Sequence, residues 1–140
     1  MTQPAGSSRH ASDNGISAPL IDELVANFYG KVRQDALLGP VFSDLIGEDW
    51  APHLKKVAAF WCYVTGLDRS YQAREFIPAH LRHSQIKASL LPRWLLLFRQ
   101  AARDVCEKEA ADRLIEIAER MAESIAISLA RRETSIERSP

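Results

Sequence analysis

Residues 49–61 read DWAPHLKKVAAFW, and the spacing of their large side chains predicts a helix with one apolar face. The residues of that face recur at i, i+4, i+7 and i+8, and they are His53, Val57, Phe60 and Trp61. We expect Asp49 to cap this helix, Pro52 to lie in its first turn and Gly66 to end it. A histidine therefore heads an apolar stripe.

Stripes with the same period lie on both sides of this helix. Upstream, Ser17 is placed to cap a helix that has Pro19 in its first turn. The apolar face of that helix contains Ile21, Leu24, Val25, Phe28 and Val32. Between the two helices, LLGPVFSDLIG at residues 37–47 predicts a short turn-and-helix connection that is broken at Gly39-Pro40.

Two more helices are predicted downstream. The first runs from about Ser89 to Lys108 and cannot begin much earlier, because Pro92 is tolerated only in a first turn. Its inner face contains Trp94, Leu97, Phe98, Ala101 and Val105. The second runs from about Ala110 to Ala130, with Leu114, Ile117, Ala118, Met121, Ile125 and Leu129 directed inward.

Four long helices and little period-two alternation predict an all-α protein. Residues 1–16 are rich in serine, glycine and other polar types, so we expect a tail without fixed structure. Residues 133–140 are also polar and are expected to fray. This leaves one folded domain at residues 17–132, which is long enough to bury its own core.

Composition and motifs exclude several functional classes. Lys+Arg and Asp+Glu both number 18, so the formal net charge is zero and the basic surface of a nucleic-acid-binding protein is not expected. We expect a cytoplasmic protein without membrane contact, because the chain has no long apolar run and no leader pattern. Cys62 and Cys106 fall in no metal-binding spacing and are expected to be reduced. The sequence has no phosphate-binding loop, dinucleotide turn, zinc-protease motif or serine-hydrolase motif.

The residues left for chemistry are histidines and large aromatic residues on or beside the apolar stripes. Tyr29 flanks the first stripe, and His53 and Trp94 each head one, where ordinary packing also explains them. His80 follows Pro78 in a short segment between two long helices. A neutral imidazole in such a place suits an axial iron ligand. A lone histidine there is more often a surface or cap residue, so the pattern alone leaves both interpretations open.

Taken together, these segments resemble the truncated haemoglobins, and within them the third group. The resemblance is carried by FYGKVRQDALLGPVF at 28–42, DWAPHLKKVAAFW at 49–61, AHL at 79–81 and RWLLLF at 93–98. These segments occur in the family's order and at about its intervals, and the match extends over about residues 20–130. The resemblance implies a truncated globin-like helical sandwich around haem b (iron protoporphyrin IX).

The resemblance also implies roles for individual residues. His80 matches the proximal iron ligand of the family. The three polar residues of its distal pocket are matched by Tyr29, His53 and Trp94, and His53 is also a candidate sixth ligand. Apolar contacts with the haem are implied for Phe42, Val57, Phe60 and Trp61. Lys56 and Arg82 are predicted to bind the haem propionates, because each lies close to one of the histidines in the sequence.

The chain departs from the family pattern on both sides of His80. YQAREFIPAH at 71–80 stands where the group usually has a turn that contains glycine and proline. Residues 83–85 are polar where apolar residues are expected, so His83 is a rival iron ligand or propionate partner. Pro92 is also unusual for the group and could shift the start of the third long helix.

The implied activity follows from two hydrogen-bond donors beside a bound gas. Tyr29 and Trp94 would each stabilise negative charge on dioxygen by roughly 1.5–3 kcal/mol, which slows its release. Slow release favours ligand chemistry, such as detoxification of nitric oxide or peroxide, or sensing, over bulk transport. We expect diatomic gases as ligands, an unidentified reductase as partner, and a monomer or weak dimer. A haem peroxidase-like enzyme and a cofactor-free helical interaction module stay open as alternatives.

Overall fold

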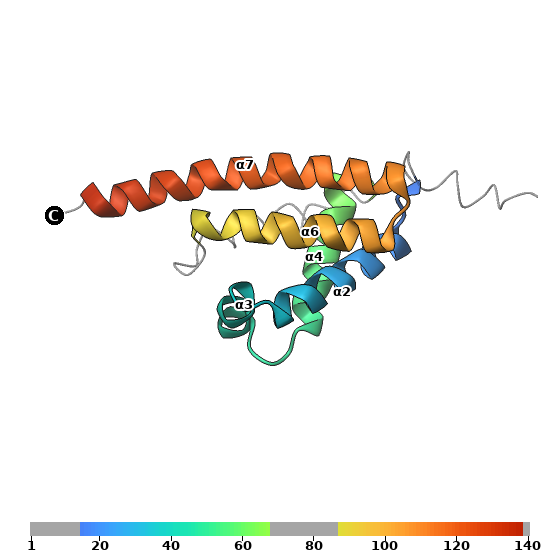
Figure 1. Ribbon diagram of the computed structural model, residues 1–140, viewed down its shortest axis with the longest axis horizontal. Coiled ribbons are helices and arrows are strands. Elements are labelled where there is room, and N and C mark those ends of the chain that lie inside the picture. The colour runs from blue at the N-terminus through green and yellow to red at the C-terminus, as the bar shows by residue number, and fades with distance from the viewer. Residues whose placement is uncertain (1–14, 68–86, 139–140) are drawn as a thin grey trace, which may run out of the picture.

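The computed structural model describes residues 15–67 and 87–138, with side chains described as far as Arg131. Its helices in these ranges are α2 (Ala18–Gln34), α3 (Leu38–Ile46), α4 (Ala51–Val64), the 3-10 helix η3 (Ala88–Leu90), α6 (Leu91–Val105) and α7 (Lys108–Arg138). Figure 1 shows α6 and α7 antiparallel and side by side. α2 packs against α3, α4 and α6, whereas α7 packs against α6 and η3. The predicted all-α class is confirmed for the part of the chain described.

α2 begins where the sequence predicts. Its N-cap is Ser17, whose Oγ accepts a hydrogen bond from the Leu20 N–H at 3.3 Å. Pro19 lies in the first turn, where a missing N–H removes no helical hydrogen bond. The predicted apolar face is buried, and Tyr29 is buried with it. Ile16, at the end of the predicted N-terminal tail, is also part of the core.

The predicted break at Gly39-Pro40 is wrong, because α3 begins at Leu38 and continues through both residues. They lie in its first turn, where the backbone N–H groups have no partner within the helix, so proline is tolerated. Glycine is needed there for another reason. A Cβ atom at residue 39 would lie 2.8 Å from the carbonyl oxygen of Arg33, near the end of α2. The close approach of α3 to α2 therefore depends on Gly39.

α4 includes residues 51–61 of the stretch DWAPHLKKVAAFW. The predicted cap at Asp49 is wrong, because the N-cap is Trp50, which makes no capping hydrogen bond through its side chain. Trp50 is buried and Asp49 is exposed, so burial of the indole sets where this helix begins. Pro52 lies in the first turn, as predicted. At the other end, the Thr65 hydroxyl donates to a carbonyl one turn earlier at 2.7 Å, and Gly66 turns the chain at φ +86°.

α6 follows η3 directly, and Pro92 lies in its first turn, as the sequence analysis requires. The helix ends at Val105 rather than at the predicted Lys108. The reason is the backbone of Cys106, which is extended at φ −108° and ψ 154° and leads the chain into α7. Leu97, Phe98, Ala101 and Ala102 form the buried face of α6.

α7 is the longest of the described helices, and Figure 1 shows it extending past α6. It runs to Arg138, beyond the predicted end at Ala130, because residues 108–138 contain neither glycine nor proline. The predicted fraying of residues 133–140 stays a prediction. Among the described helices, none combines the length and the apolar character needed to cross a membrane.

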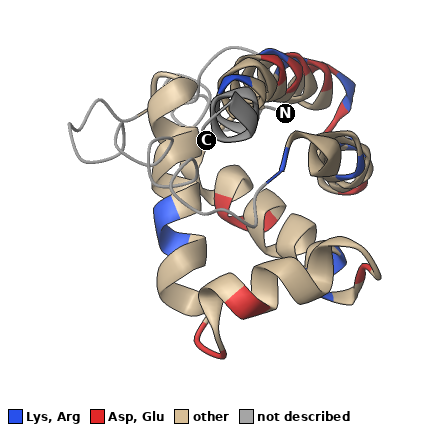
Figure 2. Ribbon diagram, turned by 90° about the vertical axis from the view of Figure 1, so that its left-hand side faces the viewer, with Lys and Arg blue, Asp and Glu red and all other residues tan. Residues whose placement is uncertain are grey.

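Exposed ion pairs connect α6 to α7. Arg99 pairs with Glu119 at 3.0 Å, and Arg103 pairs with Asp112 at 2.7 Å. Figure 2 shows basic and acidic residues interspersed along the helices. Exposed pairs contribute about 0–1 kcal/mol each, because solvent screens them. The apolar faces of the two helices therefore contribute most of the stabilisation of this contact.

Replacing Gly39 with alanine tests the close approach of α3 to α2. Gly39→Ala should lower the free energy of unfolding by about 1–3 kcal/mol, because the added methyl meets backbone that cannot move aside. Gly30→Ala is the matched control, since its methyl would meet nothing within 4 Å in the middle of α2. That change should stabilise the protein by about 0.5–1 kcal/mol. Equal stabilities of the two variants in urea unfolding would contradict this explanation.

Candidate cofactor pocket

An apolar cavity lies among α2, α3, α4, η3, α6 and α7. Its empty volume, which includes space open to solvent, is about 720 Å³. Six residues that the resemblance assigns to the haem pocket line it together: Tyr29, Phe42, Val57, Phe60, Trp61 and Trp94. The rest of the lining is mostly apolar side chains that the sequence presents as ordinary core, and it includes Leu38, Leu90, Leu91, Met121 and Ile125.

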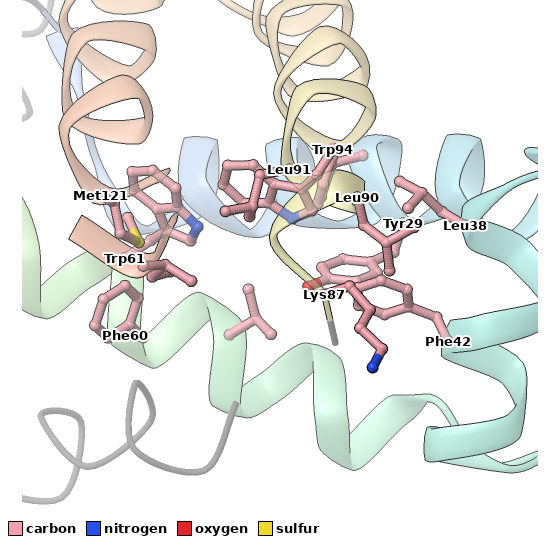
Figure 3. A pocket seen from close by; sticks show the side chains of 13 residues that line it. Tyr29, Leu38, Phe42, Phe60, Trp61, Lys87, Leu90, Leu91, Trp94 and Met121 are labelled. Atoms are coloured by element: carbon pink, nitrogen blue, oxygen red, sulfur yellow. The ribbon is translucent and has the colours of Figure 1, made fainter. Parts of the chain in front are cut away.

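The large side chains lie toward the two ends of the cavity. Figure 3 shows Phe60, Trp61 and Met121 toward one end, and Tyr29 and Phe42 toward the other. A flat apolar molecule between these ends would contact side chains on several helices. The sequence pattern predicts each apolar face but not this common wall, because the wall forms only when the helices pack.

Tyr29 is buried where α2 meets α4. Its ring makes edge contacts with Phe28, Trp50 and His53, at centroid distances of 4.8, 6.0 and 5.4 Å. Burial raises the pKa of the Tyr29 phenol far above its ordinary value, because the phenolate would lose its solvation by water. The hydroxyl therefore stays protonated at physiological pH and is able to donate a hydrogen bond.

His53 lies in the first turn of α4, next to this phenol. Its ring stands at 85° to the ring of Tyr29 and at 82° to the ring of Trp50. The Nε2 atom of His53 is shielded from solvent. His53 is not among the residues that line the cavity, so the structure places it beside Tyr29 rather than in the wall itself.

Trp94 belongs to a stack of aromatic rings that connects α6 with α4. Its ring is nearly parallel to that of Phe98, at 14° with centroids 5.7 Å apart. Phe98 in turn stacks on Trp61 at 12° and 4.9 Å. Contacts of this kind contribute about 0.5–1.5 kcal/mol beyond the area they bury. The stack therefore holds Trp61 and Trp94 to one wall of the cavity.

Lys87 is the one charged residue in the cavity lining as far as the chain is described, and the sequence analysis missed it. Lys87 is exposed, and Figure 3 shows it near Tyr29 and Phe42. Its ammonium group therefore provides positive charge at a water-exposed edge of an apolar cavity. The one hint in the sequence is its position, just before the segment that leads into the helix of Trp94.

The other predicted ligands are not placed in the cavity by the structure. Lys56 is exposed on α4 and does not line the cavity. His80, its rival His83 and the propionate candidate Arg82 lie outside the described residues. The roles of these four residues stay predictions.

A buried carboxylate joins three helix ends beside the cavity. Asp35 follows α2, and its Oδ2 accepts hydrogen bonds from the N–H groups of Leu37 and Leu38 at 3.0 and 2.9 Å. Its Oδ1 accepts from Nε of Arg93 in α6 at 2.7 Å. Only 3% of the Asp35 side chain is exposed, so these donors replace the water that the carboxylate loses. The hydrogen bond from Arg93 is the main reason why the pKa of Asp35 lies below its ordinary value.

Comparison with known proteins finds similar truncated haemoglobins, although no protein-family model matches the chain. The group 3 truncated hemoglobin Ctb of Campylobacter jejuni is 29% identical over 110 residues, which are 76% of this chain and 86% of that protein. The crystal structure of a group III truncated haemoglobin from Campylobacter jejuni matches with a TM-score of 0.75 and 26% identity. That match covers 81% of this chain and 91% of the other. The chain is similar in sequence and in fold to group III truncated haemoglobins.

The predicted truncated globin fold is thereby confirmed, and the globin family implies a haem. The cavity of this protein fits that group chemically. Its wall is apolar and rich in aromatic rings, which suits a flat macrocycle, and Lys87 supplies a cation that suits carboxylates at the macrocycle edge. The protonated phenol of Tyr29 and the indole of Trp94 are hydrogen-bond donors on the same wall.

The contact at Asp35 makes the stability of the protein depend on pH. Because the folded-state pKa of Asp35 lies below the ordinary value of 3.8, its contribution is complete above 3.8 and is lost as pH falls through the folded-state pKa. Asp35→Asn should therefore be less stable than the wild type near neutral pH, and the difference should shrink in acid. Urea unfolding at a series of pH values measures it.

Glu119→Gln is the control for this titration, because it removes an exposed ion pair of α6 and α7. Its stability should stay within about 1 kcal/mol of the wild type at every pH. A difference between the wild type and Asp35→Asn that stays constant from neutral pH into acid would show that the charge of Asp35 does not stabilise the fold.

Proposed function

We propose that this protein is a truncated haemoglobin that binds haem b in the apolar cavity, with His80 as the proximal iron ligand. The observation that supports the cavity as the haem site is its lining, which gathers six predicted haem-pocket residues from α2, α3, α4 and α6. His80 is proposed because it stands in AHL at residues 79–81, the segment that resembles the proximal site of the family.

The side chains of the wall would bind the macrocycle by burying it. Phe42, Val57, Phe60 and Trp61 offer apolar surface, and burial of such surface stabilises a complex by roughly 25 cal/mol per Å². We propose Lys87 as the partner of the haem carboxylates in place of Lys56, because Lys87 lines the cavity and Lys56 does not. When bound, haem supplies an iron that takes up diatomic gases and changes its oxidation state.

Tyr29 and Trp94 are proposed to hold the gas ligand by hydrogen bonds. The phenol of Tyr29 keeps its proton because burial raises its pKa, and the indole N–H of Trp94 can only donate. Both donors would act in a space from which apolar walls exclude water, where electrostatic contacts are stronger. Slow release of the ligand follows. The activity we propose is therefore chemistry on the bound gas, such as nitric oxide or peroxide detoxification, or gas sensing.

Two roles are proposed for His53, which lies beside Tyr29 with its Nε2 shielded from solvent. It either swings to admit the gas or ligates the iron when no gas is bound. The spin state of the ferric protein distinguishes these roles, because ligation by a second histidine gives low-spin absorption bands that disappear in His53→Ala.

Absorption spectra of histidine variants test the proximal assignment. The wild type should show a strong Soret band, and His80→Ala should lose it because the bond between iron and imidazole is removed. His83→Ala is the matched control and should keep the band. Loss of the band in His83→Ala together with its retention in His80→Ala would move the assignment to His83. A wild-type protein that keeps no Soret band after haem is added and the unbound haem is removed would refute the proposed function.

The rate of dioxygen release tests the role of Tyr29. Tyr29→Phe keeps the ring and removes the hydroxyl, so the ferrous protein should release dioxygen roughly tenfold faster or more, since such a hydrogen bond contributes roughly 1.5–3 kcal/mol. Tyr63→Phe removes the hydroxyl of a tyrosine on α4 that does not line the cavity, and its release rate should match the wild type. Release from Tyr29→Phe at the wild-type rate would mean that the phenol does not stabilise the ligand.

A further inference from the structure

Arg93 and Trp94 are neighbours in the first turn of α6, but they contact different parts of the molecule. Nε of Arg93 donates to Asp35 at the end of α2, whereas Trp94 lines the cavity. Successive residues of a helix project about 100° apart, so their directions are coupled through the backbone. Any contact that fixes Arg93 therefore also fixes the direction in which the Trp94 indole leaves the helix.

The ring contacts of Trp94 restrain it in a different way. The indole stacks on Phe98 with centroids 5.7 Å apart and meets the edge of Phe28 at 5.6 Å. Aromatic pairs stay favourable over centroid distances of about 4.5–7 Å, so rings in contact are able to slide. The ion pair is more directional, because both Nε and Nη2 of Arg93 bind the same oxygen of Asp35.

The partner of Arg93 is itself held in place. Oδ2 of Asp35 accepts the N–H groups of Leu37 and Leu38, which fixes the carboxylate against the start of α3. The side chain of Asp35 is 3% exposed and that of Arg93 is 44% exposed. Arg93 is therefore the exposed member of the pair, and its removal would leave Oδ2 of Asp35 with its two backbone donors but Oδ1 without the guanidinium. This loss is a cost to stability that the test has to separate from positioning.

We propose that the Asp35–Arg93 ion pair is a positioning device for the distal pocket, which holds the Trp94 indole N–H toward the space beside Tyr29. This inference rests on the proposed function, because the orientation of the indole matters only if a ligand binds there. Arg93 acts through Trp94 and does not touch the ligand. Without the pair, the first turn of α6 would shift along the ring stack and the donor would leave its position.

The test must separate positioning from a general loss of stability. Arg99→Met is the matched control, because it removes an ion pair with Glu119 from the same helix at a position that does not line the cavity. Arg93→Met keeps an unbranched apolar side chain but removes the guanidinium group. Arg93→Lys keeps the positive charge but loses the paired N–H donors of the guanidinium. Thermal unfolding of all variants confirms that each is folded at the temperature of the measurement.

Dioxygen release from the ferrous haem protein is the first readout. Trp94→Phe should speed release roughly tenfold, and Arg93→Met should speed it at least about threefold, with Arg93→Lys between Arg93→Met and the wild type. The double variant of Arg93→Met and Trp94→Phe should be within about twofold of Trp94→Phe alone, because the pair acts through the indole. Arg99→Met should release dioxygen at the wild-type rate.

The indole N–H resonance of Trp94 is the second readout, and it does not depend on gas release. The resonance is assigned in ¹⁵N spectra of the carbon monoxide-bound protein by its absence from Trp94→Phe. Arg93→Met should shift this resonance more than that of Trp61, whereas Arg99→Met should shift neither.

Wild-type values of both readouts in Arg93→Met would overturn the proposal. So would effects of Arg93→Met and Trp94→Phe on dioxygen release that multiply in the double variant, because the two residues would then act independently. If the wild type binds no haem, its absorption spectrum lacks the Soret band and the proposed function is wrong. In that case the Trp94 indole resonance is compared between the wild type and Arg93→Met in the purified protein without haem. A shift in Arg93→Met then still shows that Arg93 positions Trp94.

Discussion

The buried carboxylate of Asp35 is the contact on which the arrangement of the cavity depends. A carboxylate withdrawn from water is costly unless donors satisfy its oxygens, and here the backbone at the start of α3 and the guanidinium of Arg93 supply them. The end of α2, the start of α3 and the start of α6 are thereby brought to one point. Because Tyr29, Phe42 and Trp94 belong to these three helices, one ion pair sets their relative positions.

The cavity combines an extensive apolar wall with few polar groups, and each polar group differs in its environment. The phenol of Tyr29 is buried and keeps its proton, whereas the ammonium group of Lys87 lies at a water-exposed edge. This separation suits a cofactor with an apolar body and charged groups on one side. It also places a hydrogen-bond donor where water is excluded, which strengthens any contact with a polar ligand.

Most of the helices could be predicted from the sequence, because the period of the apolar residues and the first-turn prolines such as Pro92 are features of short segments. The predictions were wrong where contacts between helices set the start of a helix. Gly39 resembles a helix breaker, but it is required by the approach of α3 to α2, and burial of Trp50 overrides the expected cap. In the site, the family resemblance named six residues that share one cavity, yet no local pattern links Asp35 to Arg93, because 58 positions separate them.

Titration of the haem-free protein with haem shows whether one haem binds in this cavity. Trp61 and Trp94 line the cavity, so bound haem should quench their fluorescence. We expect quenching that saturates at one haem per chain. Binding should be much weaker in Val57→Glu, which would place a carboxylate in the apolar wall. Quenching that never saturates, or an unchanged titration in Val57→Glu, would contradict haem binding in this cavity.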